Sequence, residues 1–192
     1  MARAVSSGSR PRPSATRYVA FLRAINVGGH VVKMEQLRAA FEAIPLSGVS
    51  TFIASGNVIF ESGRAPALVE TVIEKKLRTI LGYEVAAMVR SGTELAAIVR
   101  HVEQQAIGPA AGITLYVGFL KAAPSPELAD AVGALSNDVD LLAVHGRELY
   151  WRCRTSFAES TVGGPRLEKL LKTPATIRNF NTVQRLNTKI AP

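Results

Sequence analysis

The chain has 192 residues, a formal net charge of +8 and 47% hydrophobic residues, so it can bury a core and is not generally disordered. Its single cysteine excludes a disulfide framework, and three scattered histidines could form a four-ligand zinc site with that cysteine only if all four took part. No apolar run reaches the roughly 18 residues that a membrane-spanning helix needs. These features predict a cytoplasmic globular protein with no membrane partner, and they indicate no metal and no cofactor.

The charge is distributed unevenly along the chain. Residues 1–16 hold three arginines, no acidic residue and many Ser, Pro and Ala, which predicts a disordered tail. Residues 91–151 carry three basic and seven acidic residues, whereas residues 152–192 carry eight basic and two acidic ones. This asymmetry predicts a basic surface near the C-terminus, of the kind that binds polyanions.

Residues 17–90 read as one folding unit. Apolar residues at Met34, Leu37, Phe41 and Ile44 fall on one face of a helix, and Ser55-Gly56-Asn57 has the composition of a tight turn between two strands. The expected order is strand, helix, strand, strand, helix, strand, at residues 18–25, 34–44, 49–54, 58–61, 69–80 and 85–89. This βαββαβ order predicts an α+β fold with a ferredoxin-like unit, in which two helices pack on one face of an antiparallel sheet.

Residues 91–192 are expected to form a second, smaller α+β unit packed on the first. Ser91 and Glu94 have the spacing of a capping box, and Ser125-Pro126 places a helix cap before a proline at the first helical position. The expected elements are helices after these two caps, near 167–171 and over 179–189, with strands at 113–120, 139–144 and 149–152. A degenerate copy of the first unit would account for this composition, although no clear sequence repeat is visible.

Three polar, glycine-bearing or basic segments are candidates for ligand binding. Asn26, Gly28 and Gly29 lie between a strand and a helix, where backbone N–H groups can bind an anion, although a simple turn explains them too. Ser55 and Asn57 are either a plain hairpin turn or ligand contacts. At the start of the last helix, Thr176 or Asn179 is a candidate cap. The proposed ligand-binding set also includes four more residues with suitable donors, Arg23, Arg178, Asn179 and Asn181.

Candidates for catalysis are poor. Cys153 lies between Arg152 and Arg154, but strand alternation places its thiol on the opposite face from both guanidinium groups, which favours an inert core cysteine. The three histidines have no carboxylate at a spacing that suggests a triad or a metal site. The residues therefore indicate no reaction type.

Several separated motifs resemble the bacterial domain-of-unknown-function family 1697. They are Tyr18–Gly29 (YVAFLRAINVGG), Met34–Leu37 (MEQL), Thr51–Phe60 (TFIASGNVIF), Arg147–Tyr150 (RELY) and Ala175–Val183 (ATIRNFNTV). The resemblance implies a cytosolic α/β protein related to ferredoxin-like folds, with no assigned activity, cofactor or catalytic residue. The chain departs from the family pattern at Ala24, where glycine is usual, at Phe180, where tryptophan is usual, and at Ser160-Thr161, where Ser-Lys is common.

The sequence is therefore compatible with three functions. The favoured one is binding of an anionic ligand, nucleic acid or another polyanion through a basic surface. The second is an enzyme acting on a small phosphorylated or carboxylated substrate, with Asn26, the Gly28-Gly29 amides, Ser55, Asn57 and Arg178 in one pocket. The third is an oligomerisation or partner-binding protein, in which hydrophobic strand edges pair between chains; the oligomeric state is left open.

Overall fold

The structure is a computed structural model that describes residues 15–25, 31–53, 56–155, 159–160 and 162–191. It contains two four-stranded antiparallel sheets and six helices in that part of the chain, which confirms the α+β class. None of the helices in these segments is long and apolar enough to cross a membrane. The predicted tail over 1–16 lies outside the described residues except for its last two positions, and Thr16 already begins the first strand.

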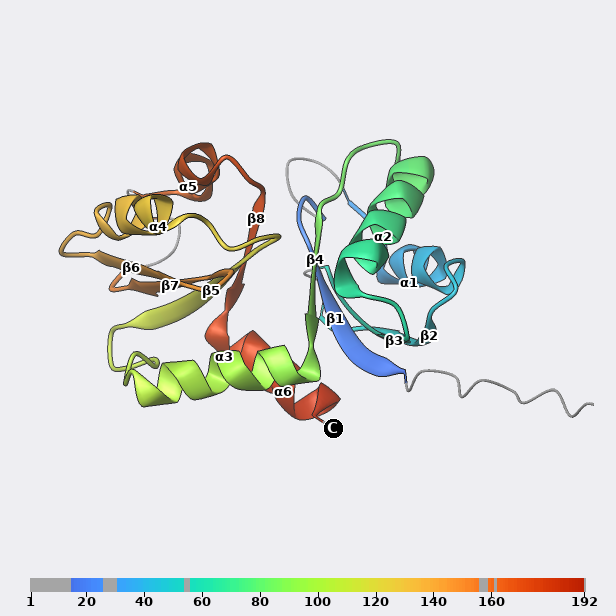
Figure 1. Cartoon of the computed structure of the whole chain (residues 1–192), viewed down its shortest axis with the longest axis horizontal. Helices are drawn as coiled ribbons and strands as arrows, with labels where there is room; N and C mark the ends of the chain where they lie inside the picture. The colour runs from blue at the N-terminus through green and yellow to red at the C-terminus, as the bar shows by residue number, and fades with distance from the viewer. Residues whose placement is uncertain (1–14, 26–30, 54–55, 156–158, 161, 192) are drawn as a thin grey trace, which may run out of the picture.

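The first sheet has the strand order β2-β3-β1-β4, with every neighbouring pair antiparallel. The order of elements along the chain is the one that the apolar spacing predicts. The elements are β1 (Thr16–Leu22), α1 (Met34–Glu42), β2 (Ser47–Thr51), β3 (Asn57–Ser62), α2 (Pro66–Leu81) and β4 (Ala87–Ser91). Both α1 and α2 cover the outer face of this sheet (Figure 1).

The second sheet has the equivalent order, β6-β7-β5-β8, again with antiparallel neighbours. Its elements are β5 (Thr114–Leu120), α4 (Pro126–Gly133), β6 (Asp140–His145), β7 (Glu148–Cys153), α5 (Gly164–Leu171) and β8 (Ala175–Asn179). Each sheet is followed by one further helix, α3 (Gly92–Gln104) after β4 and α6 (Phe180–Ile190) after β8. The second half therefore repeats the first, element for element.

A short sequence repeat accompanies this structural repeat, contrary to the expectation that none is visible. Tyr18–Arg23 reads YVAFLR and Tyr116–Lys121 reads YVGFLK, and each segment covers the last five residues of the equivalent strands β1 and β5 and the residue that follows. The register also matches, since Val19 pairs with Arg90 in the first sheet and Val117 pairs with Arg178 in the second.

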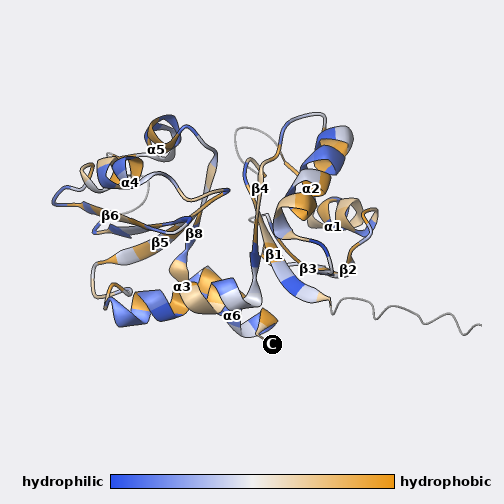
Figure 2. Cartoon of the chain, viewed as in Figure 1, coloured by the Kyte–Doolittle hydropathy of each residue, from blue (hydrophilic) through white to orange (hydrophobic). Residues whose placement is uncertain are grey.

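Three hydrophobic clusters hold the layers together. One lies between the first sheet and the helices α1 and α2, and another lies between the second sheet and α4 and α5. The third lies at the centre, where the inner faces of both sheets meet α3 and α6. There Phe21 and Phe119, which are equivalent residues of β1 and β5, stack with ring centroids 3.8 Å apart and an interplanar angle of 9°. Figure 2 shows hydrophobic residues along the sheets and on the helix sides that face them.

Local sequence signals account for many of the element ends. Ser91 and Glu94 form the predicted capping box, Ser125 caps the helix that Pro126 begins, and Gly82 ends α2 in the left-handed conformation. No strand is predicted before the last helix, but residues 175–179 form the strand β8, and α6 begins directly after it, close to the predicted start at 179. Of the two candidate caps there, Asn179 is the cap, and its side chain accepts a hydrogen bond from the backbone N–H of Asn181 (2.9 Å).

Candidate anion-binding site

Two of the predicted site residues, Arg178 and Asn57, meet between the two halves of the molecule. Arg178 Nε donates a 2.7 Å hydrogen bond to Asn57 Oδ1, across 121 positions of sequence. Asn57 begins β3, and Arg178 lies in β8 of the other sheet. The Asn57 side chain in turn donates to the backbone oxygen of Phe52 (3.2 Å), which directly follows β2.

The guanidinium of Arg178 is held at the end of β1. Its Nη2 donates to the backbone oxygen of Leu22 (2.9 Å), while Nη1 donates to Thr176 Oγ1 (2.8 Å) and to the backbone oxygen of Ile177 (2.9 Å). The guanidinium carbon lies 6.0 Å from the centroid of the Phe21 ring. These bonds use four of the five N–H groups of an arginine and leave one Nη2 N–H.

Burial lowers the pKa of Arg178 to about 10. A buried cation is costly unless a negative charge lies beside it. Among the residues that the structure describes, no carboxylate forms an ion pair with Arg178, and all four of its hydrogen-bond acceptors are neutral. The site therefore carries an uncompensated positive charge within the described part of the chain.

The repeated fold supplies a direct comparison, because Arg90 of β4 is the equivalent of Arg178. Arg90 Nη2 donates to the backbone oxygen of Leu120 (2.8 Å), the equivalent of Leu22, and its Nη1 donates to the backbone oxygen of Val89 (3.1 Å). Its guanidinium carbon lies 5.5 Å from the centroid of Phe119. Each arginine thus reaches from its own half to the end of the central strand of the other half.

The two sites differ in charge. Arg90 Nε donates to Glu148 Oε1 at 2.7 Å. Glu148 is the equivalent of Asn57, since Glu148 pairs with Phe119 in the second sheet and Asn57 pairs with Phe21 in the first. Burial lowers the pKa of Arg90, and the neighbouring Glu148 carboxylate acts against that shift. The Arg90 side chain is fully buried, so the carboxylate balances a charge that water cannot solvate.

A second pair of charges completes the Arg90 site. Arg147 of the β6–β7 turn forms an ion pair with Glu94, the third residue of α3. At the equivalent positions the Arg178 site has Gly56 before β3 and Thr182 as the third residue of α6. Two arginines and two glutamates therefore neutralise one site, whereas its counterpart keeps one arginine, an amide, a hydroxyl and a glycine.

Backbone strain accompanies the uncompensated site. Ala24 follows β1 with φ +66°, and Ile53 follows β2 with φ +49°. The left-handed region is unfavourable for residues other than glycine, and most of all for a β-branched side chain. Gly146, which follows β6 in the other half, adopts a similar φ of +60° without that cost. Strained residues of this kind concentrate at functional sites.

The other predicted site residues have varied positions. Arg23 forms an ion pair with Glu168, with a second bond of 2.6 Å between Nη2 and Oε2, so a carboxylate already balances its charge. Asn179 caps α6, and Asn181 is exposed in its first turn. Asn26, Gly28, Gly29 and Ser55 lie outside the described residues. The sequence reasoning missed the Leu22 carbonyl, which the YVAFLR and YVGFLK repeat could have indicated through the second half.

Other reactive groups form no recognisable catalytic centre in the described segments. Cys153 is buried, as expected for a core cysteine, and its Sγ lies 3.3 Å from the backbone oxygen of Thr155. His101 and His145 stack with centroids 4.2 Å apart; burial and the neighbouring His145 lower the pKa of His101. No group of three or more His, Cys, Asp or Glu side chains in these segments could hold a metal ion.

Comparisons with known proteins show the fold and the family of this chain. The structure is similar to that of the conserved bacterial protein SP0830 from Streptococcus pneumoniae, with a TM-score of 0.68 and 22% sequence identity over 93% of this chain and 100% of that one. At this identity the similarity shows the fold alone. No curated protein matches the chain. A family model described as a protein of unknown function matches residues 15–150, and the chain therefore belongs to the DUF1697 family.

Proposed function

We propose that this protein binds a small oxyanion, a phosphate or carboxylate group, at Arg178. The observation that supports this proposal is the contrast between the two equivalent arginines. Arg90 has Glu148 as a counter-ion, whereas the position of Glu148 is taken by the neutral Asn57 beside Arg178. A ligand carrying one negative charge would give Arg178 the balance that Arg90 obtains from its own chain.

Two further features support the binding of an oxyanion here. Arg178 keeps one Nη2 N–H after its four protein bonds, and the Thr182 hydroxyl lies in the first turn of α6, where anions are favoured. The side chains at three equivalent positions are shorter than in the Arg90 site, with Gly56, Asn57 and Thr182 in place of Arg147, Glu148 and Glu94. Arginine with a few neutral donors is a common recognition set for phosphate and carboxylate groups.

The test uses the full chain and measures its thermal midpoint and its heat of binding with sodium phosphate and with sodium acetate. The two salts distinguish the two oxyanion classes. We expect Asn57→Asp, which places a carboxylate 2.7 Å from Nε, to remove the response to both salts while the chain stays folded. Arg178→Gln should also remove it, and the matched control Arg100→Gln, an exposed arginine of α3, should keep it. A response to phosphate or acetate that is unchanged in Asn57→Asp would overturn the proposal.

A further inference from the structure

The internal repeat places a second arginine, Arg185 of α6, at the Arg178 site. The helices α3 and α6 follow the equivalent strands β4 and β8, and their buried residues have the same spacing: Gly92, Leu95, Ile98 and Val102 in α3, and Phe180, Val183, Leu186 and Ile190 in α6. In this alignment of the two helices Arg185 is the equivalent of Ala97. A hollow of about 240 Å³ at the Arg90 site is lined by Ala97 and by the charged residues of that site, Glu94, Arg147 and Glu148. The Arg178 site therefore has a guanidinium group where the Arg90 site has a methyl group.

A row of contacts supports this placement. The guanidinium carbon of Arg185 lies 5.0 Å from the centroid of the Phe52 ring. Phe52 is the equivalent of His145, another residue that lines the hollow of the other half. The Phe52 backbone N–H donates to the backbone oxygen of Asn57 (2.9 Å), and the Asn57 side chain accepts the 2.7 Å hydrogen bond from Arg178. Contacts through Phe52 and Asn57 therefore connect the two arginines.

The two equivalent sites differ by two charges. In the Arg90 site two arginines form ion pairs with two glutamates, and these four charges cancel. All 15 acidic residues lie in the described segments, and none of them forms an ion pair with Arg178 or Arg185 there. The contact of Arg185 with Phe52 does not balance its charge, because an aromatic ring attracts a cation without carrying a net charge. Two positive charges at the Arg178 site are therefore without a counter-ion in the described chain.

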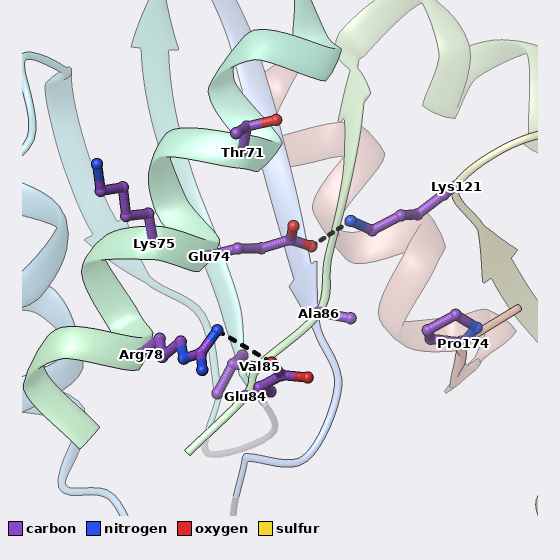
Figure 3. Close-up of a pocket in the computed structure, with 9 residues that line it drawn as sticks. All are labelled: Thr71, Glu74, Lys75, Arg78, Glu84, Val85, Ala86, Lys121 and Pro174. Atoms are coloured by element: carbon purple, nitrogen blue, oxygen red, sulfur yellow. Dashed lines mark ion pairs between the residues drawn. The ribbon is translucent and has the colours of Figure 1, made fainter. Parts of the chain in front are cut away.

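A cavity of about 460 Å³ beside α2 lacks such an excess of positive charge (Figure 3). Three cations line it. Lys121 forms an ion pair with Glu74, and Arg78 forms one with Glu84. Lys75 forms no ion pair in the described part of the chain. The cavity therefore offers one cation without a counter-ion, which suits a doubly charged anion less well than two arginines do.

We infer that the ligand of the proposed oxyanion site is a phosphate monoester in its dianionic form, and that Arg185 selects it over singly charged anions. This inference rests on the proposed function. A monoester has three terminal oxygen atoms and a charge of about −1.5 to −2 at pH 7, so it can balance both arginines. Arg185 follows Thr182 by three positions, which places both side chains on the same face of α6, beside the remaining Nη2 N–H of Arg178. A carboxylate carries one charge and would leave one of the two arginines without a counter-ion.

The experiment measures the binding of methyl phosphate and of dimethyl phosphate to the full chain by titration calorimetry at pH 8 and constant ionic strength. Methyl phosphate is a dianion at this pH, because its second pKa is about 6, whereas dimethyl phosphate is a monoanion. We expect methyl phosphate to bind about tenfold more tightly, as one further charge contact at a partly exposed site predicts. Arg185→Gln should reduce this preference to below about twofold and leave the affinity for dimethyl phosphate nearly unchanged. Arg185→Lys keeps the charge and should keep most of the preference.

Two control variants remove a cation elsewhere. Arg100→Gln removes an exposed arginine of α3, Lys75→Gln removes the cavity lysine that forms no ion pair, and both should keep the preference for methyl phosphate. Loss of the preference in Lys75→Gln, an unchanged preference in Arg185→Gln, or an equal loss in Arg185→Lys would overturn the inference. Tighter binding of succinate than of methyl phosphate would also overturn it, because the two charges would then belong to separate carboxylates. Equal affinity for the two esters would overturn this inference and leave the proposed oxyanion site standing, whereas absence of binding by both esters and by acetate would overturn both.

Discussion

The substitution Glu148→Gln tests whether the carboxylate beside Arg90 balances a buried charge. Arg90 is fully buried and the Glu148 side chain is 12% exposed, with Nε and Oε1 2.7 Å apart. Removing one partner of a buried ion pair costs about 3–5 kcal/mol, and glutamine keeps a hydrogen-bond acceptor, so we expect a loss of about 2–3 kcal/mol in the free energy of unfolding. For a chain of this length the thermal midpoint should fall by about 4–12 °C.

The single tryptophan, Trp151, reports this change in urea unfolding, because it is buried in the same strand as Glu148. Its Nε1 donates to Asp140 at 2.7 Å, so its emission should change when the second sheet unfolds. The matched control is Glu103→Gln, an exposed glutamate near the end of α3, which should leave the unfolding midpoint unchanged.

A smaller substitution should make this site sensitive to small anions. Glu148→Ala removes the carboxylate together with its volume beside Arg90, so formate should bind there and restore stability. Formate at ten times its dissociation constant would restore about 1.4 kcal/mol, whereas sodium chloride at equal ionic strength controls for screening. A loss below about 0.5 kcal/mol, or a loss that formate does not reduce, would refute the argument that these arginines need a negative partner.

Three further predictions concern stability and can be checked by urea unfolding. Ala24→Gly should raise the free energy of unfolding by about 0.5–1 kcal/mol, because φ at this residue is +66°; a lower midpoint would contradict the strain. Gly92→Ala should lower the free energy of unfolding by about 1–3 kcal/mol, since a Cβ there would lie 2.9 Å from the Ile190 backbone oxygen. The control Gly108→Ala should be nearly neutral with respect to packing, because the nearest atom to a Cβ at that position is 3.8 Å away. Burial raises the pKa of Glu70, so the ionised carboxylate destabilises the native state at neutral pH. Glu70→Gln should therefore have the higher free energy of unfolding at pH 7. This advantage should disappear below about pH 4.5, where the wild-type side chain is protonated in both the folded and the unfolded state.

Much of the fold follows from local signals that act over a few residues. Apolar spacing identified both helices of the first sheet, and the Ser91–Glu94 capping box placed the start of α3. The strand β8 could not be recognised in this way. It has five residues, only Thr176 among them is buried, and its polar residues are as typical of a helix start as of an edge strand.

The candidate site could be predicted only in part. Arg178 and Asn57 were identified as polar residues in separate motifs, and the structure places them 2.7 Å apart. The partners that give Arg178 its environment are a backbone oxygen and an aromatic ring, and their positions depend on how the two sheets pack. Ion pairing is a tertiary property as well, which is why Arg23 resembled a free cation in the sequence although Glu168 binds it.

The repeat also explains how one chain can keep an uncompensated charge on the half-buried Arg178. The Arg90 site is closed by its own carboxylates and links the two halves through Glu148 and the Leu120 carbonyl. The Phe21–Phe119 stack joins the two sheets between the arginines, so packing at the centre does not depend on a ligand at Arg178. A symmetric scaffold can then carry two copies of one arrangement with separate roles. One copy contributes to stability, and under the proposed function a ligand supplies the negative charge that the other copy lacks. The neutral residue at position 57 is then the feature that distinguishes the two sites.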